Sequence, residues 1–190
     1  NPIVLFKKWF ATAEKSETND PNALSLATSS SDGIPSVRMV LLKGLSDSGF
    51  VFYTNFDSKK GNDLKSNPNA SMCFHWKSIR RQIRVSGKVS SVDKEEADKY
   101  FASRDYGSKI SAWASSQSKV MKNRNEFLDK IKEYEKKFPD KNNVSRPTHW
   151  SGWKIIPNEI EFWLEIKNRS HQRLNYRKES GNWIKEILYP

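Results

Sequence analysis

The chain is poor in the residues that build disulfides and metal clusters. Its 190 residues include one cysteine, Cys73, and three scattered histidines, His75, His149 and His171. A single cysteine cannot form a disulfide within the chain, and the histidines lack the spacing of metal ligands. We therefore expect no metal site and a reducing, cytoplasmic environment.

Long apolar runs and glycine-rich phosphate loops are also missing. No segment approaches the roughly 20 apolar residues of a transmembrane helix, and the first residues lack the pattern of a signal peptide. Neither a GxGxxG motif nor a P-loop occurs. We expect no membrane partner, and a phosphate-bearing ligand would need a different kind of binding site.

Positive charge and aromatic residues are abundant. The formal net charge is +11, and aromatic residues make up 12% of the chain, seven of them tryptophan. This is too aromatic for a disordered protein, and the length suits a single domain over residues 1–190. Lysine and arginine are spread over the whole length, so nucleic-acid binding remains an alternative to small phosphorylated ligands, which a basic cleft also attracts.

The apolar periodicity predicts strands joined by short turns, together with several helices. Helical spacing of Leu5, Phe6, Trp9 and Phe10 predicts a helix over residues 2–13. Further helices are expected over 59–66, 94–103, 109–115 and about 117–138. Strands are expected over 23–28, 36–44, 50–54, 70–76, 79–92, 149–156, 159–166, 171–177 and 183–188, with a turn at Asn158. This order favours an antiparallel barrel or sandwich.

The run from Ser36 to Gly44 is typical of a largely buried strand that forms a hairpin with residues 50–54. Within it, Arg38 and Lys43 are an odd number of residues apart and would lie on opposite faces. A buried strand rarely carries two unpaired cations. Either both side chains reach solvent, or each binds a different anion.

Two other segments could hold a phosphate. Tyr100 and Arg104 are four residues apart on an expected helix that Gly107 would end, and Ser108 could cap the next helix. A phenol, a guanidinium and a helix N-terminus together would bind phosphate, but a surface pair beside an ordinary cap has the same spacing. Gln117 and Ser118, at the expected start of the long helix, leave the same choice open.

Cationic or ionisable residues also occur at every second position in the segment of Arg169, His171 and Arg173. In a strand they would project from one face. Placed against an aromatic such as Trp163, they would suit an anionic or electron-rich ligand, although such a row is also common on a solvated face.

A series of short motifs follows along the chain: RMVLLK (38–43), FVFYT (50–54), SKKG (58–61), NP (67–68), RQIR (81–84), YFASR (100–104), AWAS (112–115) with QS (117–118), RP (146–147) and EFW (161–163). In this order they closely resemble the pyridoxine (pyridoxamine) 5′-phosphate oxidase family over residues 2–190. The resemblance implies an α+β, mainly antiparallel fold, the FMN-binding split β-barrel with flanking helices. It also implies a homodimer with FMN at the interface, in which strands 149–190 serve dimerisation and the active site.

The resemblance further implies site residues. Those expected to bind FMN are Arg38, Met39, Val40, Leu41, Leu42, Lys43, Tyr53, Thr54, Lys59, Lys60, Gln82, Gln117, Ser118, Trp163 and Arg173. Among them, the candidates for the FMN phosphate are Arg38, Lys59, Lys60 and Ser118. Those expected to bind the substrate are Lys43, Tyr100, Arg104, Ser108, Arg169 and His171, with Arg169 and His171 also in catalytic roles.

The implied activity is FMN-dependent oxidation of pyridoxine or pyridoxamine 5′-phosphate to pyridoxal 5′-phosphate, in vitamin B6 biosynthesis and salvage. Oxygen would accept the electrons and leave as hydrogen peroxide, and the amine substrate would release ammonia. Four positions depart from the family pattern: Ser170 replaces a leucine, Gln172 replaces an aspartate, Lys59 replaces a common arginine and so loses a bidentate fork, and Ile187 replaces an arginine. A flavin enzyme with another substrate, and a non-catalytic protein that binds FMN or a B6 phosphate, remain alternatives.

Overall fold

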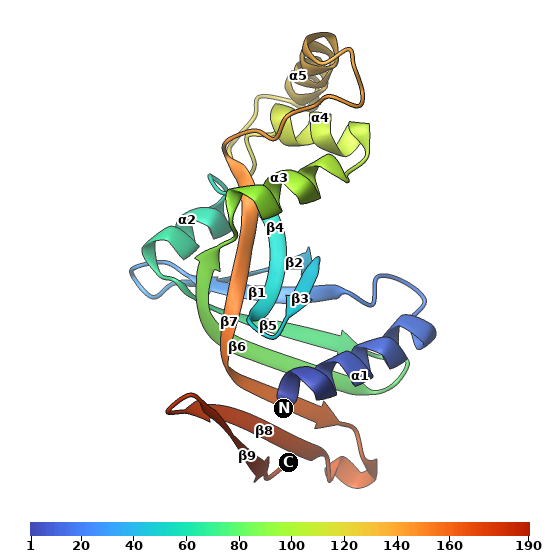
Figure 1. Cartoon of the computed structure of the whole chain (residues 1–190), viewed down its shortest axis with the longest axis vertical. Helices are drawn as coiled ribbons and strands as arrows, with labels where there is room; N and C mark the ends of the chain where they lie inside the picture. The colour runs from blue at the N-terminus through green and yellow to red at the C-terminus, as the bar shows by residue number, and fades with distance from the viewer.

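One strongly curved antiparallel sheet carries the architecture, as Figure 1 shows. The computed structural model describes residues 1–190. The strands are β1 (Ala23–Ser29), β2 (Pro35–Leu41), β3 (Gly44–Ser46), β4 (Gly49–Asn55), β5 (Asn69–Trp76), β6 (Arg81–Ser91), β7 (Trp150–Leu164), β8 (Gln172–Glu179) and β9 (Asn182–Leu188). Their order is β2-β1-β5-β6-β7-β4-β3, and β8 pairs with both β7 and β9. The sheet curls into a half-barrel, which confirms the predicted fold class.

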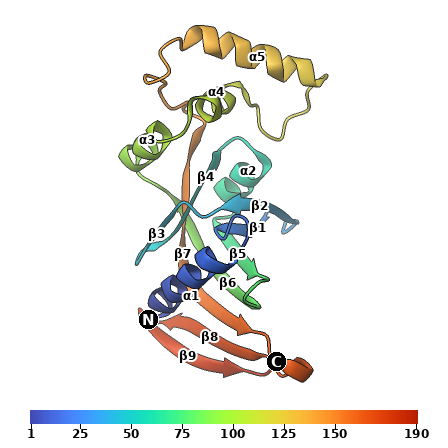
Figure 2. The ribbon, with the colours of Figure 1, turned by 90° about the vertical axis from the view of Figure 1, so that its right-hand side faces the viewer.

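Five α-helices accompany the sheet: α1 (Pro2–Ser16), α2 (Lys59–Ser66), α3 (Lys94–Ala102), α4 (Tyr106–Ala114) and α5 (Arg124–Lys137), with a short 3-10 turn η1 (Lys167–Arg169). None of these helices is both long and apolar enough to cross a membrane. Figures 1 and 2 show α3, α4 and α5 together at one end of the molecule and the β8–β9 hairpin at the other.

The helix α1 packs on the sheet through aromatic rings. Phe6 is fully buried and meets the edge of Phe50 at 4.9 Å and of Phe74 at 5.1 Å between ring centroids. Edge-to-face packing of this kind adds to the hydrophobic gain from burial. The helix predicted over 2–13 is confirmed, and its first turn is capped by Asn1, whose side chain accepts a hydrogen bond from the Ile3 N–H.

The long strand β7 links the two ends. Its first residues pair with β4, its last residues pair with β8, and β6 lies along most of its length. The prediction of a turn at Asn158 was wrong, because Asn158 is instead an extra residue in a β-bulge where the register shifts at Gly87. A Cβ on Gly87 would come within 2.1 Å of the Ile156 carbonyl oxygen, so the close approach requires glycine.

The strand β2 differs from its prediction in burial and in pairing. It pairs only with β1 and so lies at the edge of the sheet, with Val37 69% exposed and Met39 63% exposed. The alternation of faces is as expected, but the strand is half exposed in the single chain. The hairpin with β4 is made by the short strand β3, because β2 ends at Leu41.

The helical end was predicted in outline and misplaced in detail. Asp105, not Ser108, caps α4 by accepting the Ser108 N–H at 2.8 Å, and Gly107 lies inside that helix. The helix expected over 94–103 is α3, and its N-cap residue, Asp93, makes no side-chain capping hydrogen bond. The helix expected over about 117–138 begins only at Arg124 as α5, so residues 117 and 118 lie in an irregular loop and Val120 is fully exposed.

Candidate functional site

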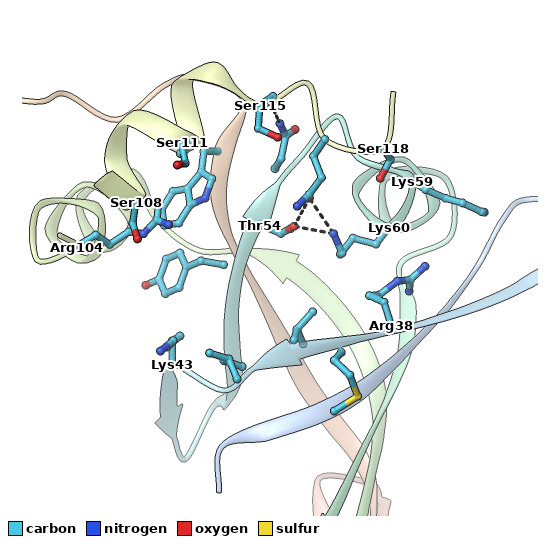
Figure 3. Close-up of a pocket in the computed structure, with 18 of the residues that line it drawn as sticks. Arg38, Lys43, Thr54, Lys59, Lys60, Arg104, Ser108, Ser111, Ser115 and Ser118 are labelled. Atoms are coloured by element: carbon cyan, nitrogen blue, oxygen red, sulfur yellow. Dashed lines mark hydrogen bonds between the residues drawn. The ribbon is translucent and has the colours of Figure 1, made fainter. Parts of the chain in front are cut away.

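A cavity of about 660 Å³ lies between β2, β4, the start of α2 and the helices α3 and α4, within the size range of small-molecule sites (Figure 3). Five of its lining residues are cations and none is a carboxylate, so the cavity favours an anionic ligand. The lining residues are Arg38, Met39, Val40, Leu41, Lys43, Tyr53, Thr54, Asn55, Lys59, Lys60, Tyr100, Arg104, Ser108, Ser111, Ala112, Ser115, Gln117, Ser118, Phe127 and Trp150.

Lys60 is the buried cation of the cavity. Its Nζ donates to Thr54 Oγ1 at 3.0 Å, to Gln117 Oε1 at 2.9 Å and to Ser58 Oγ at 3.3 Å. All three partners are neutral, and burial together with the charge of Arg38 lowers the pKa of Lys60 to about 8. A bound anion would supply the missing counter-charge.

The guanidinium of Arg38 is held in place by hydrogen bonds and by a nearby carboxylate, none of which comes from a residue that lines the cavity. Its Nη1 donates to Thr28 Oγ1 at 2.7 Å and to the Leu26 carbonyl at 3.1 Å, and Asp63 lies 3.8 Å from its Nη2. Burial lowers the pKa of Arg38 despite the Asp63 charge. Burial alone would raise the pKa of Asp63, but hydrogen bonds from Thr28 and Lys59 and the nearby cations hold it below its usual value. Asp63 is therefore ionised and fixes the guanidinium beside the cavity.

Arg104 lies at the other side of the cavity on a ladder of aromatic rings. Tyr53 stacks on Tyr100 at 3.9 Å and on Trp150 at 5.3 Å, and the Arg104 guanidinium lies 4.8 Å from the Trp150 ring centre. Burial lowers the pKa of Arg104, and its Nη1 is buried without a hydrogen-bond partner. Burial and the Glu96 charge raise the pKa of Tyr53 to about 12, so its hydroxyl is neutral. The unpaired N–H groups of Arg104 remain available to an acceptor.

The cations thus form two groups. Figure 3 shows Arg38, Lys59, Lys60 and Ser118 on one side of the cavity and Lys43, Arg104 and Ser108 on the other. Arg38 and Lys43 were expected on opposite faces of one strand, yet both line the cavity. The strand ends at Leu41, so its alternation does not continue to Lys43.

Most of the site residues expected from the sequence line this cavity, and six do not. Leu42 is turned away and belongs to the hydrophobic core. The others are Gln82, Trp163, Arg169, His171 and Arg173, near the β8–β9 hairpin at the far end of the chain (Figure 1). Gln82 and Arg173 are direct cross-strand neighbours of Trp163. One chain therefore holds two separate halves of the expected site.

The row from Arg169 to Arg173 is not a continuous strand. Arg169 ends the turn η1 with a φ of +60°, and β8 begins at Gln172. His171 packs on Trp163 with ring centroids 4.6 Å apart, and its Nδ1 accepts the Ile166 N–H at 3.2 Å. The neutral ring therefore carries its proton on Nε2, which faces away from that contact. Because of the turn η1, the three side chains do not all project from one face of a strand, contrary to the prediction from the sequence.

Sequence reasoning missed six residues that line the cavity: Asn55, Ser111, Ala112, Ser115, Phe127 and Trp150. The motif at residues 112–115 pointed to two of them, but no spacing signal indicated that Trp150 would lie under Arg104. That contact joins residues 46 positions apart through the helical end, and only tertiary packing creates it.

The sequence of this chain matches a known protein family over most of its length. Residues 10–138 match the family described as pyridoxamine 5′-phosphate oxidase, and residues 150–190 match the pyridoxine 5′-phosphate oxidase C-terminal dimerisation region. A pyridoxine/pyridoxamine 5′-phosphate oxidase of Pelagibacter ubique is 57% identical, covering 100% of this chain and 92% of the relative. The chain belongs to the pyridoxamine 5′-phosphate oxidase family. The family resemblance predicted from the motifs is confirmed.

Two solved structures extend the comparison. PhzG from Burkholderia lata, in complex with tetrahydrophenazine-1-carboxylic acid, has a TM-score of 0.94 at 32% identity and covers 100% of this chain and 93% of its own. A pyridoxamine 5′-phosphate oxidase-related, FMN-binding protein from Nostoc punctiforme has a TM-score of 0.78 at 17% identity, with 100% and 98% covered. The second likeness concerns the fold alone. Both solved structures thus have the same overall fold as this chain.

Proposed function

We propose that this chain is an FMN-dependent oxidase that converts pyridoxine or pyridoxamine 5′-phosphate to pyridoxal 5′-phosphate. Oxygen accepts the electrons and is released as hydrogen peroxide, and the amine substrate also yields ammonia. The observation that carries the proposal is the cavity with five cations in two groups and no carboxylate. Two phosphorylated ligands, cofactor and substrate, match two groups of cations.

The residues present fit a flavin mononucleotide. Lys60 is a buried cation with only neutral partners, and Lys59 and Lys60 form the first turn of α2, whose N-terminus adds positive potential. With Arg38 and Ser118 they would hold the phosphate. FMN would supply two-electron chemistry by accepting a hydride.

The second group of cations suits the substrate phosphate. The buried, unpaired Nη1 of Arg104 is an unsatisfied donor that a phosphate oxygen would satisfy. Tyr100, Ser108 and Lys43 add neutral and charged donors around it. These contacts would anchor the substrate through a group remote from the reaction, so that its ring is correctly oriented.

A homodimer would complete the site. Trp163, Arg169, His171 and Arg173 lie far from the cavity in one chain, and the C-terminal strands match a dimerisation region. In a two-fold assembly the second half of the site would come from the partner subunit. Arg169 would then face the substrate ring and stabilise developing charge, and His171 would offer its Nε2–H as a hydrogen-bond donor.

An absorbance spectrum followed by a peroxide assay tests the proposal. The protein reconstituted with FMN should show bound-flavin absorbance and release hydrogen peroxide when pyridoxamine 5′-phosphate is added. Protein that retains no FMN and stays inactive would refute it. The similarity to PhzG motivates one other outcome, an oxidase of a different substrate: FMN would bind, but both B6 phosphates would be ignored and Arg104→Ala would not alter turnover.

A further inference from the structure

Glu161 is a buried carboxylate that does not line the cavity. It lies on β7, is 5% exposed, and accepts hydrogen bonds from two arginines. Arg173 donates from Nε to Oε1 at 2.9 Å and from Nη2 to Oε2 at 3.0 Å, and Arg84 also donates to Oε2. A buried ion pair is weak evidence for stabilisation, since apolar residues of the same volume often serve as well. The cluster needs a different explanation.

The contacts leave the Arg173 guanidinium in one orientation. Besides the bidentate pair with Glu161, its Nη1 donates to the Tyr189 carbonyl at 2.9 Å. A guanidinium has five N–H groups, and these three bonds leave one free on Nη1 and one on Nη2. A planar group fixed at three points cannot rotate, so the two free donors point in a set direction.

The Glu161 carboxylate is ionised in its contact with the two arginines. Burial alone would raise the pKa of Glu161, but hydrogen bonds from Arg173 and Arg84 hold it below its usual value. Trp163 is the cross-strand partner of Arg173 and so lies on the same face of the sheet. The ion pair therefore stands directly beside the second half of the expected site.

We propose that Glu161 is a positioning residue, which holds Arg173 so that its two free N–H groups bind FMN. The inference rests on the proposed function, in which Arg173 contacts the cofactor. Gln172, the neighbour of Arg173, cannot take this role, because it is exposed and carries no charge. In this chain the orienting carboxylate thus comes from the neighbouring strand β7, not from the residue beside Arg173.

The test is a double-mutant cycle read out as the Kd for FMN, measured by quenching of flavin fluorescence. Glu161→Gln keeps the shape but loses the charge, and should raise the Kd roughly tenfold, the size typical for loss of an orienting partner. Arg173→Met should weaken binding at least as much. Because Glu161 acts through Arg173, the double variant should bind no more weakly than Arg173→Met alone. Additive effects would mean a merely structural role and overturn the proposal.

Glu186 supplies a matched control. It accepts a hydrogen bond from Arg177 at 3.1 Å in the same hairpin, so Glu186→Gln removes a comparable contact and should leave the Kd unchanged. If Glu161→Gln does not fold, Arg173→Lys carries the test, because it keeps the charge without the bidentate fork. Native affinity in Arg173→Lys or Glu161→Gln would overturn the role of Glu161. Failure of the unaltered protein to bind FMN would instead refute the proposed function.

Discussion

Lys60 is the cavity residue whose charge depends most on its surroundings. Its pKa of about 8 means that it loses its proton just above neutral pH, whereas an anion beside it would favour the protonated form. We expect the Kd for FMN to be constant below pH 7.5 and to rise above pH 8, by at most about tenfold per pH unit. Fluorescence titrations of FMN between pH 7 and 9.5 measure this pH dependence of the Kd. The variant Lys60→Met should bind FMN more weakly at every pH, and its Kd should not rise above pH 8.

The two groups of cations predict a division of labour between Arg38 and Lys43. Arg38→Ala should weaken FMN retention, because Arg38 lies beside Lys60 in the first group. Lys43→Ala should chiefly raise the KM for pyridoxamine 5′-phosphate. Charged hydrogen bonds contribute about 1.5–3 kcal/mol, so each effect should be roughly 10- to 100-fold. Flavin content and steady-state kinetics on the two variants separate them; loss of flavin alone in both would contradict the division.

Arg104 belongs to the substrate side and rests on Trp150. Arg104→Met keeps part of the packing on the ring and removes the donors, so the KM for pyridoxamine 5′-phosphate should rise by about 10- to 100-fold. The Kd for FMN should hardly change. Titrating FMN into the variant supplies the control, and an equal loss of both ligands would place Arg104 at a shared site instead.

At the scale of elements, α2 depends on a close contact that only glycine allows. A Cβ on Gly61 would come within 2.2 Å of the Phe56 carbonyl oxygen. Gly61→Ala should therefore displace the first turn of α2 with Lys59 and Lys60, lower stability by about 1–3 kcal/mol, and weaken FMN binding.

Gly107 is the control for this substitution. It also lies in a helix, but a Cβ there would meet only Asp105 Oδ1 at 3.5 Å. Gly107→Ala should stabilise the protein by about 0.5–1 kcal/mol, because alanine loses less backbone entropy in a helix. Urea unfolding of the two variants compares them directly, and equal stabilities would show that the Phe56 contact is not restrictive.

At the scale of the whole molecule, the exposed apolar face of β2 is the surface we expect a second copy to cover. Val37→Glu places a charge on this face and should shift the protein from dimer to monomer in analytical ultracentrifugation. FMN affinity should fall with it, since the second half of the site would be lost. Val4→Glu, on an exposed valine of α1, should leave the mass unchanged. A Val37→Glu dimer with full flavin affinity would contradict this assignment.

Periodicity and capping in the sequence determined most helices and strands, because these depend on neighbouring residues. The helix predicted over 59–66 is confirmed as α2, and the strands predicted over 171–177 and 183–188 are confirmed as β8 and β9, joined by a turn at Ser180 and Gly181. The predictions that were wrong concern residue types that are compatible with two different local structures. Asn158 fits a turn or a bulge, and Ser108 can cap a helix or lie within one.

Only the tertiary structure decided how the candidate site is distributed. The motifs placed Lys60, Arg104 and Arg173 in one site, but Arg173 lies on β8, which pairs with the far end of the long strand β7, away from the cavity. Likewise, Trp150 meets Arg104, and Glu161 fixes Arg173, through contacts that no spacing along the chain could indicate. Short-range hydrogen bonds and hydrophobic periodicity depend on residues that are close in the sequence, so the sequence alone predicts them. Contacts between side chains that are distant in the sequence depend on the curvature of the sheet, which only the tertiary structure shows.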